Sequence, residues 1–269
     1  MLRLSALYRF PLKSCKPESL QRATVDELGL VGDRRWMLVD ADTGRFLTQR
    51  TFPHMSQLSV LWNAHGGVTL SAPGAAPLEV PLPDDVEANL RGVILWRDTL
   101  QVPDAGEAAA QWASALIGKP TRVVHVPLAR ARRLPDGYAG AHDKVAFADG
   151  FPLLLIGQGS LDDLSGRIGR PMDMLRFRPN LVIEGAGAFA EDGWKRIRIG
   201  DIEFRLVKPC ARCILTTVDP ATGTRSEDRE PFTTLKRYRA TEDGVMFGQN
   251  LVSDGVGEIE VGMDVEILE

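Results

Sequence analysis

The chain has 269 residues, a length that allows one large domain or two moderate ones with buried cores. Hydrophobic residues make up 44% and charged residues 25%, which is the composition of a globular protein. The formal net charge of −4 gives no indication of a nucleic-acid partner or a membrane-surface partner. No stretch approaches the roughly 18 apolar residues of a membrane-spanning helix.

The cysteines indicate the redox environment of the protein. There are three of them: Cys15, Cys210 and Cys213. A small, odd number argues against a disulfide framework and favours a reducing compartment, so we expect a cytoplasmic protein. The N-terminal segment 1–13 is interrupted by Arg3 and Arg9. It therefore lacks the apolar core of a signal peptide and predicts a first β-strand.

The first 120 residues predict short strands separated by turn residues. Segments 35–39 and 45–48 flank Asp42-Thr-Gly44, which indicates a hairpin because glycine allows a positive φ. Further strands are expected at 57–62, 67–71, 77–82, 92–96 and 99–102. Four prolines between residues 73 and 83 exclude a long helix in that region.

Two helices are predicted. The first, 105–117, is rich in alanine and follows Asp104, a possible N-cap. The second, 160–168, carries its leucines and isoleucine on one face, and the spacing of Ser160 and Asp163 resembles a capping box. The first helix and the following proline mark the predicted domain boundary, with one domain at 1–120 and another at 121–269.

After residue 151 the pattern returns to strands, after a predicted surface loop at 128–144. The expected strands are 152–156, 181–183, 197–199, 202–207 and 214–218. The last segment, 258–268, alternates apolar and charged residues with Gly262 at a bend, as a terminal barrel strand would. Short strands joined by tight turns favour β-barrels, so we expect a mainly β fold with a few short helices.

The pair Cys210-x-x-Cys213 is the first segment that could carry chemistry. It could be half of a zinc site, a redox-active dithiol, or a place where one thiolate binds another metal. A zinc site needs two more ligands, and no second paired motif is present. A thioredoxin-like pair opens a helix, whereas 214–218 is β-branched. From spacing alone, two half-buried cysteines in a barrel remain the commonest meaning.

Three other segments carry side chains suited to an anion. Lys13 and Ser14 follow the first strand, where a solvated turn is the ordinary interpretation. Arg34, in Gly-Asp-Arg-Arg-Trp, opens another strand, and ion pairing would explain it equally well. Arg178 and Asn180 flank a proline; arginine can bind phosphate or a planar heterocycle, and asparagine both donates and accepts. None of these segments is specific alone.

Their combination and order closely resemble the MOSC superfamily. Within it, the chain resembles the branch of the mitochondrial amidoxime-reducing component and bacterial YcbX-like proteins. The segment 178–219, in which Cys213 is followed by Ile-Leu-Thr-Thr-Val-Asp-Pro, is the most specific part. The resemblance implies an N-terminal MOSC β-barrel domain followed by a MOSC β-barrel domain, with an inter-domain cleft for a ligand.

The resemblance also implies that the chain binds the molybdenum cofactor, which is molybdopterin carrying molybdenum. The metal ligand would be Cys213 rather than Cys210, and a soft thiolate suits this metal. The residues implied to hold the phosphate and the pterin are Lys13, Ser14, Arg34, Arg178 and Asn180.

The implied reaction is the reduction of small N-hydroxylated compounds, which consumes two electrons and two protons and releases water. The cofactor would supply the redox chemistry. Asp149 is a candidate for proton delivery, although a turn aspartate is the ordinary explanation. Longer bacterial relatives carry a ferredoxin domain, whereas this chain ends at Glu269 with no cysteine left for a cluster. We therefore expect an external electron-transfer protein, either a flavin or an iron–sulfur reductase.

Two alternatives remain open. MOSC domains also occur at the C-terminus of molybdenum cofactor sulfurases, so the chain could transfer sulfur or carry the cofactor, with Cys213 as persulfide or ligand. A third interpretation keeps the fold without redox chemistry and lets the cysteine pair bind zinc or a partner protein. Turnover of an amidoxime separates the first two hypotheses, and metal analysis separates the third.

Overall fold

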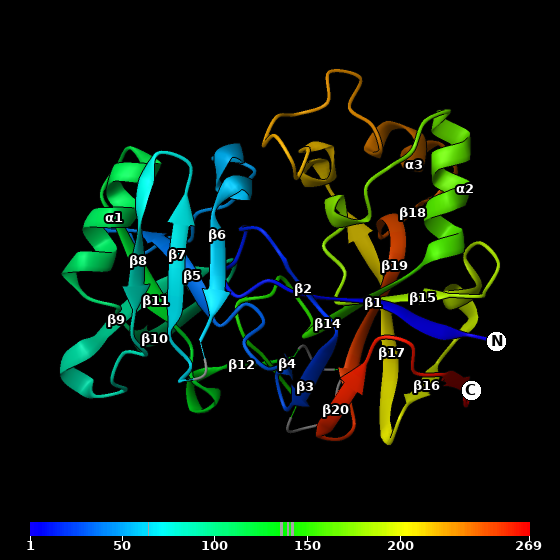
Figure 1. Ribbon diagram of the computed structural model, residues 1–269, viewed down its shortest axis with the longest axis horizontal. Coiled ribbons are helices and arrows are strands. Elements are labelled where there is room, and N and C mark those ends of the chain that lie inside the picture. Colours follow the sequence, from blue (N-terminus) through cyan, green and yellow to red (C-terminus); the bar gives the residue numbers. More distant parts are fainter. Residues whose placement is uncertain (64, 135–136, 139, 141–142) are drawn as a thin grey trace.

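Strands predominate in the computed structural model, which describes residues 1–63, 65–134, 137–138, 140 and 143–269 (Figure 1). Three α-helices accompany them in this part of the chain: α1 (Glu107–Ile117), α2 (Gln158–Ile168) and α3 (Phe232–Tyr238). The prediction of a mainly β fold with a few short helices is therefore confirmed. No helix within the described ranges is long and apolar enough to cross a membrane.

The largest sheet has the strand order β2-β1-β15-β14-β19-β17-β16-β21. These strands, with β18 beside β19, are β1 (Arg3–Arg9), β2 (Glu18–Leu20), β14 (Leu153–Gly157), β15 (Leu181–Glu184), β16 (Arg196–Ile199), β17 (Ile202–Arg212), β18 (Ala240–Thr241), β19 (Gly244–Ser253) and β21 (Val265–Ile267). The N–H of Leu4 donates to the Met263 carbonyl at 2.9 Å, and that of Val265 donates to the Leu2 carbonyl at 3.0 Å. These bonds join β1 to the start of β21 and close the sheet into a barrel.

The barrel is filled by side chains that alternate along its strands. Leu4, Leu155 and Phe204 are fully buried and belong to one hydrophobic cluster. Strands β14 and β15 pair in parallel, and α2 connects them, while the other pairs of this sheet are antiparallel. In Figure 1 the barrel occupies one lobe, and α2 and α3 lie together at its upper end.

Smaller sheets complete the fold, and most of them form the other lobe (Figure 1). The pairs are β5 (Trp36–Asp40) with β11 (Thr121–His125), β9 (Leu90–Leu95) with β10 (Asp98–Pro103), and β12 (Arg132–Arg133) with β13 (Lys144–Val145). The three-stranded sheets are β6 (Ser59–Trp62), β7 (Val68–Ala72) and β8 (Ala75–Val80), and β20 (Gly257–Glu260), β3 (Arg22–Asp26) and β4 (Gly29–Leu30). Strands from both sides of residue 120 pair with one another. Strand β1, before residue 120, pairs with β15 in the barrel, and β11, after residue 120, pairs with β5.

Both predicted helices are present and end at the expected residues, but the two predictions of their N-terminal caps are wrong. Helix α1 begins after Gly106, and Asp104 accepts a hydrogen bond from the Gly106 N–H instead of capping the helix. Helix α2 begins after Gly157, so Ser160 lies inside it, and no side chain of its own caps it. Ser160 Oγ instead donates to the buried carboxylate of Glu191 at 2.7 Å. A tertiary contact has replaced the local capping box.

Other differences concern short β-branched segments. The expected strand 45–48 forms only isolated bridges to neighbouring strands. The expected strand 214–218 is wrong, because β17 continues to Arg212 and is followed by a 3-10 helix, η6 (Ile214–Thr217). The hydroxyls of Thr216 and Thr217 donate to the backbone carbonyls three residues earlier, at 3.0 and 2.7 Å. Such local side-chain bonds compete with strand pairing. Helix α3 was not expected from the pattern.

The C-terminal segment bends at Gly262, as predicted, where φ is +96°. Strand β20 before the bend pairs with β3, and β21 after it pairs with β16. In the predicted surface loop 128–144, the structure contains η3 (Leu128–Arg130) and the pair β12 and β13. Residues 135–136, 139 and 141–142 of that loop lie outside the described residues.

Candidate functional site

A cavity at the junction of the two lobes is lined by residues from widely separated parts of the chain. Its empty volume is about 930 Å³, part of which is open solvent at the mouth. The structure brings all seven residues singled out from the sequence to its walls: Lys13, Ser14, Arg34, Asp149, Arg178, Asn180 and Cys213. It also brings Cys210 and two further arginines, Arg50 and Arg212, that the sequence had not marked as site residues.

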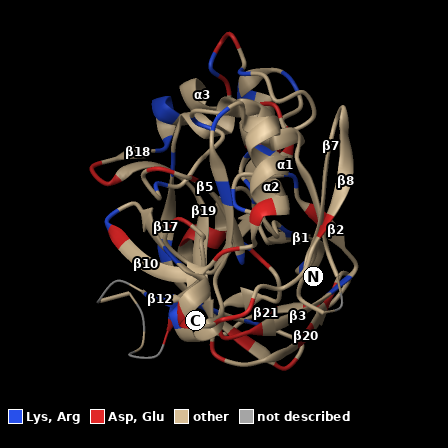
Figure 2. Cartoon of the chain, turned by 90° about the vertical axis from the view of Figure 1, so that its left-hand side faces the viewer, with Lys and Arg blue, Asp and Glu red and all other residues tan. Residues whose placement is uncertain are grey.

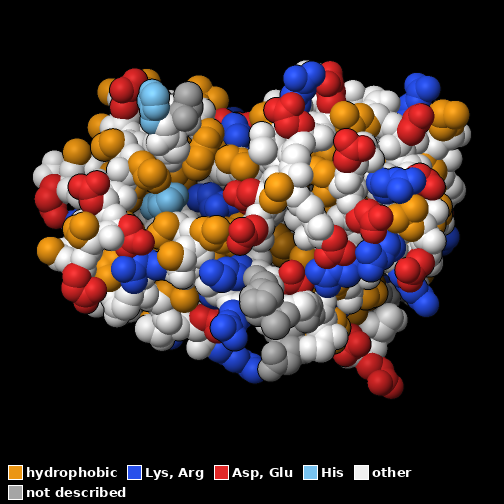
Figure 3. Space-filling model, turned by 90° about the horizontal axis from the view of Figure 1, so that it is seen from below, with side chains coloured by type: hydrophobic (Ala, Val, Ile, Leu, Met, Phe, Trp, Pro, Cys, Tyr) orange, Lys and Arg blue, Asp and Glu red, His pale blue; other side chains and the backbone are white. Residues whose placement is uncertain are grey.

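The charge of the cavity wall is opposite to that of the whole chain. Its lining contains five cationic side chains and one carboxylate, a local excess of four positive charges, while the chain carries −4. Elsewhere acidic and basic side chains are interspersed along the chain (Figure 2), and both kinds occur on the two lobes of the face in Figure 3. A concave wall with an excess of one charge focuses its field on a ligand of opposite charge. The cavity is therefore suited to an anion.

Lys13 and Asp149 form a close ion pair in this wall. Lys13 Nζ donates to Asp149 Oδ1 at 2.5 Å and to the Phe147 carbonyl at 2.7 Å. Burial lowers the pKa of Lys13 to about 8, although Asp149 opposes this shift. Desolvation in the cavity wall would raise the pKa of Asp149, whose side chain is only partly covered, but Lys13 and Arg50 outweigh it and hold that pKa below its usual range. Asp149 is therefore an ionised hydrogen-bond acceptor at neutral pH.

Asn180 holds the side chain of Arg34 in place through a hydrogen bond. Its side chain is fully buried; Oδ1 accepts hydrogen bonds from Arg34 Nη1 at 2.9 Å and from the Leu154 N–H at 3.2 Å. Its Nδ2 donates to the Tyr8 carbonyl at 3.1 Å. The amide therefore ties β1 to β14 and directs the Arg34 guanidinium, which also donates to the Arg178 carbonyl at 3.0 Å.

Arg178 has a donor that the protein leaves unused. Its Nη1 donates to the Cys15 carbonyl at 2.7 Å, and its guanidinium lies 4.1 Å from the centroid of the Phe10 ring. Its Nη2 is buried without a hydrogen-bond partner among the described residues, as is Nε of Arg212. Burial and the neighbouring Arg34 lower the pKa of Arg178 to about 9. Because buried polar groups are normally paired, these two donors indicate space for an acceptor.

The backbone of the cavity wall is held in an unusual conformation at three of these positions. Ser14, Arg34 and Arg178 have φ values of +69°, +47° and +58°. Residues other than glycine rarely adopt this region, and it is found at functional sites where the surrounding structure enforces it. The basic side chains are therefore aimed at the cavity by a constrained backbone.

The cysteine pair lies at the end of β17. Cys210 is within the strand and Cys213 precedes η6, and both thiols are free. Arg50 Nη2 lies 3.5 Å from Cys213 Sγ, and Arg212 Nη1 lies 3.0 Å from Cys210 Sγ. Within the described ranges, no group of three His, Cys, Asp or Glu side chains is arranged to hold a metal ion. The zinc interpretation has no ligand set there.

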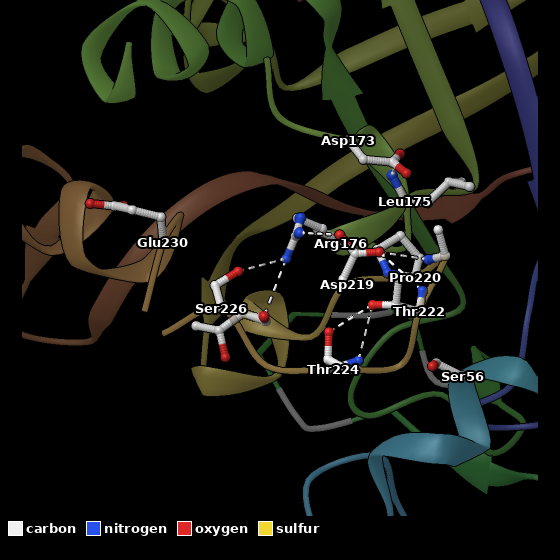
Figure 4. A network of polar contacts seen from close by, with 12 residues as sticks. Ser56, Asp173, Leu175, Arg176, Asp219, Pro220, Thr222, Thr224, Ser226 and Glu230 are labelled. Carbon is white, nitrogen blue, oxygen red and sulfur yellow. Dashed lines mark hydrogen bonds and ion pairs between the residues drawn. The ribbon is translucent and has the colours of Figure 1, made fainter. Parts of the chain in front are cut away.

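The loop after Cys213 is anchored by Arg176, which ends the 3-10 helix η4 (Met174–Arg176). Figure 4 shows Arg176 at the centre of the polar network around this loop. Its Nη2 donates to Asp219 Oδ2 at 2.7 Å, and its Nη1 donates to the carbonyl of Thr217 at 3.2 Å and to Ser226 Oγ at 3.3 Å. The segment that carries Arg178 and the segment that follows Cys213 are thus fixed to one another.

Of the two arginines that the sequence had not marked as site residues, Arg212 could have been inferred and Arg50 could not. Arg212 lies between the two cysteines, so its place in the cavity follows from theirs. Arg50 stands in Thr-Gln-Arg-Thr, a segment with no recognisable pattern. Only the tertiary fold brings it to Cys213.

Comparison with known proteins gives two domain matches. The model of the MOSC N-terminal beta barrel domain matches residues 1–120, and that of the MOSC domain matches residues 142–266. The chain is 35% identical over 281 residues to mitochondrial amidoxime-reducing component 1 of Mus musculus, an alignment that covers 98% of this chain and 82% of that protein. Against the Homo sapiens protein the identity is 34% over 282 residues, with the same coverage. Mitochondrial amidoxime reducing component 2 of Rattus norvegicus is 32% identical, covering 96% of this chain and 81% of that protein.

Proposed function

Since the chain belongs to the MOSC family of the mitochondrial amidoxime-reducing components, we propose that it is an oxidoreductase that binds the molybdenum cofactor and reduces N-hydroxylated compounds. The observation that carries this proposal is the cavity. It combines a free thiol, Cys213, with five cationic side chains in the lobe junction of an acidic chain. That combination suits a ligand with a soft metal at one end and a phosphate at the other.

The residues present fit the cofactor. Cys213 Sγ would be the metal ligand, and the cationic side chains would hold the anionic part. The unused Nη2 of Arg178 supports this assignment, because a phosphate or pterin oxygen would satisfy it. Asn180, whose polar atoms already contact the protein, would act through Arg34 instead of touching the ligand. When bound, the cofactor would supply two-electron redox chemistry.

The protein itself would place the substrate and supply a proton. Asp149 is ionised beside Lys13, so it would deliver a proton only as a relay from Lys13 Nζ, 2.5 Å away. Lys13, with a pKa of about 8, carries a proton that can be exchanged near neutral pH.

We also propose that the two electrons come from an external flavin or iron–sulfur protein. The three free cysteines support a reducing compartment, the cytoplasm.

The test is reduction of benzamidoxime by molybdenum-loaded protein with an artificial electron donor. One benzamidine should form for every two electrons consumed, and Cys213→Ala should form none. A loaded wild-type protein that reduces no N-hydroxylated compound but passes its cofactor to an apo-enzyme would replace this proposal by the carrier hypothesis. A persulfide on Cys213 that is transferred to an acceptor would replace it by the sulfur-transfer hypothesis.

A further inference from the structure

Arg50 reaches the sulfur of Cys213 from the other lobe. Its Nη2 lies 3.5 Å from Cys213 Sγ and 3.3 Å from Asp149 Oδ2, although 163 residues separate it from the cysteine. The guanidinium therefore bridges the thiol and the carboxylate of the cavity. Arginine remains charged across the working pH range and offers five N–H donors in a fixed plane. A thiolate at this position would accept a charge-assisted hydrogen bond.

The position of Arg50 is set by contacts on several sides. Its guanidinium lies 4.9 Å from the centroid of the Trp96 ring. Trp96 is itself held by an edge contact with Phe46 and by a hydrogen bond from its Nε1 to Asp149 Oδ1 at 3.3 Å. Trp96 has a φ of +57°, a conformation that bulky residues adopt only when the structure enforces it.

The backbone of Arg50 is fixed as well. Its carbonyl accepts a hydrogen bond from Arg225 Nη2, a residue of the loop that follows Cys213. One residue therefore contacts both the sulfur and the loop that presents it. Because the aromatic and acidic neighbours are already in place, the hydrogen bond to sulfur requires little further ordering.

We propose that Arg50 is a positioning residue for the metal ligand, whose N–H···S bond orients the Cys213 sulfur and raises the reduction potential of the metal bound to it. This inference rests on the proposed function. A hydrogen bond and a positive charge beside a sulfur ligand stabilise the more electron-rich, reduced state of a metal site more than its oxidised state. Loss of the bond should therefore make the metal harder to reduce.

The test uses holoprotein with two substitutions and one control. Arg50→Met removes the donors and the charge at similar length, and Arg50→Lys restores a charge and a donor. The control is Arg97→Met, which removes an exposed cation next to Trp96. Molybdenum content is measured first, followed by a redox titration and the electron paramagnetic resonance spectrum of the half-reduced metal.

Arg50→Met should shift the equilibrium toward oxidised metal about tenfold, or about 59 mV toward negative potential for a one-electron step. Its spectrum should change, Arg50→Lys should recover part of the shift, and Arg97→Met should match wild type. An unchanged potential and spectrum in loaded Arg50→Met, with a raised KM for benzamidoxime, would overturn the inference and make Arg50 a substrate ligand. An equal shift in Arg97→Met would overturn it in favour of a diffuse charge effect.

Two outcomes concern loading. If Arg50→Met holds no molybdenum, Arg50→Gln takes its place, because glutamine lacks the positive charge; a loaded Arg50→Gln with wild-type potential and spectrum would overturn the inference. If wild type itself holds no molybdenum under conditions that load a known molybdenum enzyme, the proposed function fails and the inference fails with it. The inference alone fails when wild type is loaded and active but the Arg50 variants share its potential.

Discussion

Lys13 Nζ and Asp149 Oδ1 lie 2.5 Å apart across 136 residues of sequence, inside a cavity whose other charged side chains are arginines. Lys13 is only 5% exposed. Burial lowers its pKa to about 8, and the neighbouring Arg132 and Arg34 act in the same direction against the attraction of Asp149. The positive charge of the cavity is therefore sensitive to pH just above neutrality.

Cofactor affinity should fall as the pH rises through about 8, because neutral Lys13 no longer attracts an anion. The measurement is the equilibrium dissociation of pterin at several pH values between about 6.5 and about 9.5. Lys13→Gln should bind weakly throughout this range and lose the pH dependence. The same fall in Lys13→Gln as in wild type would assign the pH dependence to another group.

The same pKa has a consequence for stability. Lys13 has its ordinary pKa of 10.5 in the unfolded chain and a pKa of about 8 in the folded protein. At pH values between these two pKa values, the unfolded chain therefore binds more protons than the folded one. The free energy of unfolding of the cofactor-free protein should therefore rise with pH in this window, by about 3 kcal/mol relative to Lys13→Gln. Urea denaturation of both proteins at each pH measures this difference, and parallel curves would refute it.

Arg176→Met should destabilise the protein and displace the loop after Cys213. It removes the partner of the Asp219 carboxylate and of two backbone carbonyls, which should cost about 2–4 kcal/mol. Molybdenum content should fall with it. The matched control is Arg170→Met, whose ion pair with Asp228 is exposed and should contribute less than about 1 kcal/mol. Equal losses of unfolding free energy in the two variants would contradict the anchoring role.

Two glycine substitutions should act in opposite directions. Gly248, within β19, has φ +80°, and a Cβ there would lie 2.7 Å from both Ile156 Cγ1 and the Leu155 carbonyl oxygen. Gly248→Ala should therefore destabilise the barrel by more than about 1 kcal/mol. Gly166, inside α2, has nothing within 4 Å of its Cβ position. Gly166→Ala should stabilise by about 0.5–1 kcal/mol. Thermal unfolding measures both, and a stabilised Gly248→Ala would contradict the barrel geometry.

The sequence predicted strands best where apolar alternation met a turn residue. The bend at Gly262 is one example: a glycine inside an alternating segment was enough to locate it, and the residue has a φ of +96° in the structure. The local rules failed where a distant group intervened. Ser160 has the spacing of a capping residue, yet it bonds to Glu191, 31 residues away. Thr216 and Thr217 have strand propensity, yet their hydroxyls bond to the preceding backbone and favour η6.

The residues of the candidate site also fall into those that the sequence could identify and those that only the fold brings together. Six of its residues could be named because they stand in short motifs whose order along the chain resembles one family, whereas Asp149 was named only as a candidate proton donor in a turn. Arg50 could not, because its segment carries no pattern and its contact with Cys213 exists only in the folded chain. The role of Asn180 also required the structure, since only its hydrogen bonds show that it acts on Arg34.

Whether Cys213 holds molybdenum is decided by the molybdenum and pterin content of protein made in a host competent for cofactor synthesis. Wild type should be compared with Cys213→Ala and Cys210→Ala, two single-thiol changes in the same cavity. We expect about one molybdenum per chain, retained in Cys210→Ala and lost in Cys213→Ala. Zinc in place of molybdenum, or equal molybdenum in both variants, would contradict this expectation.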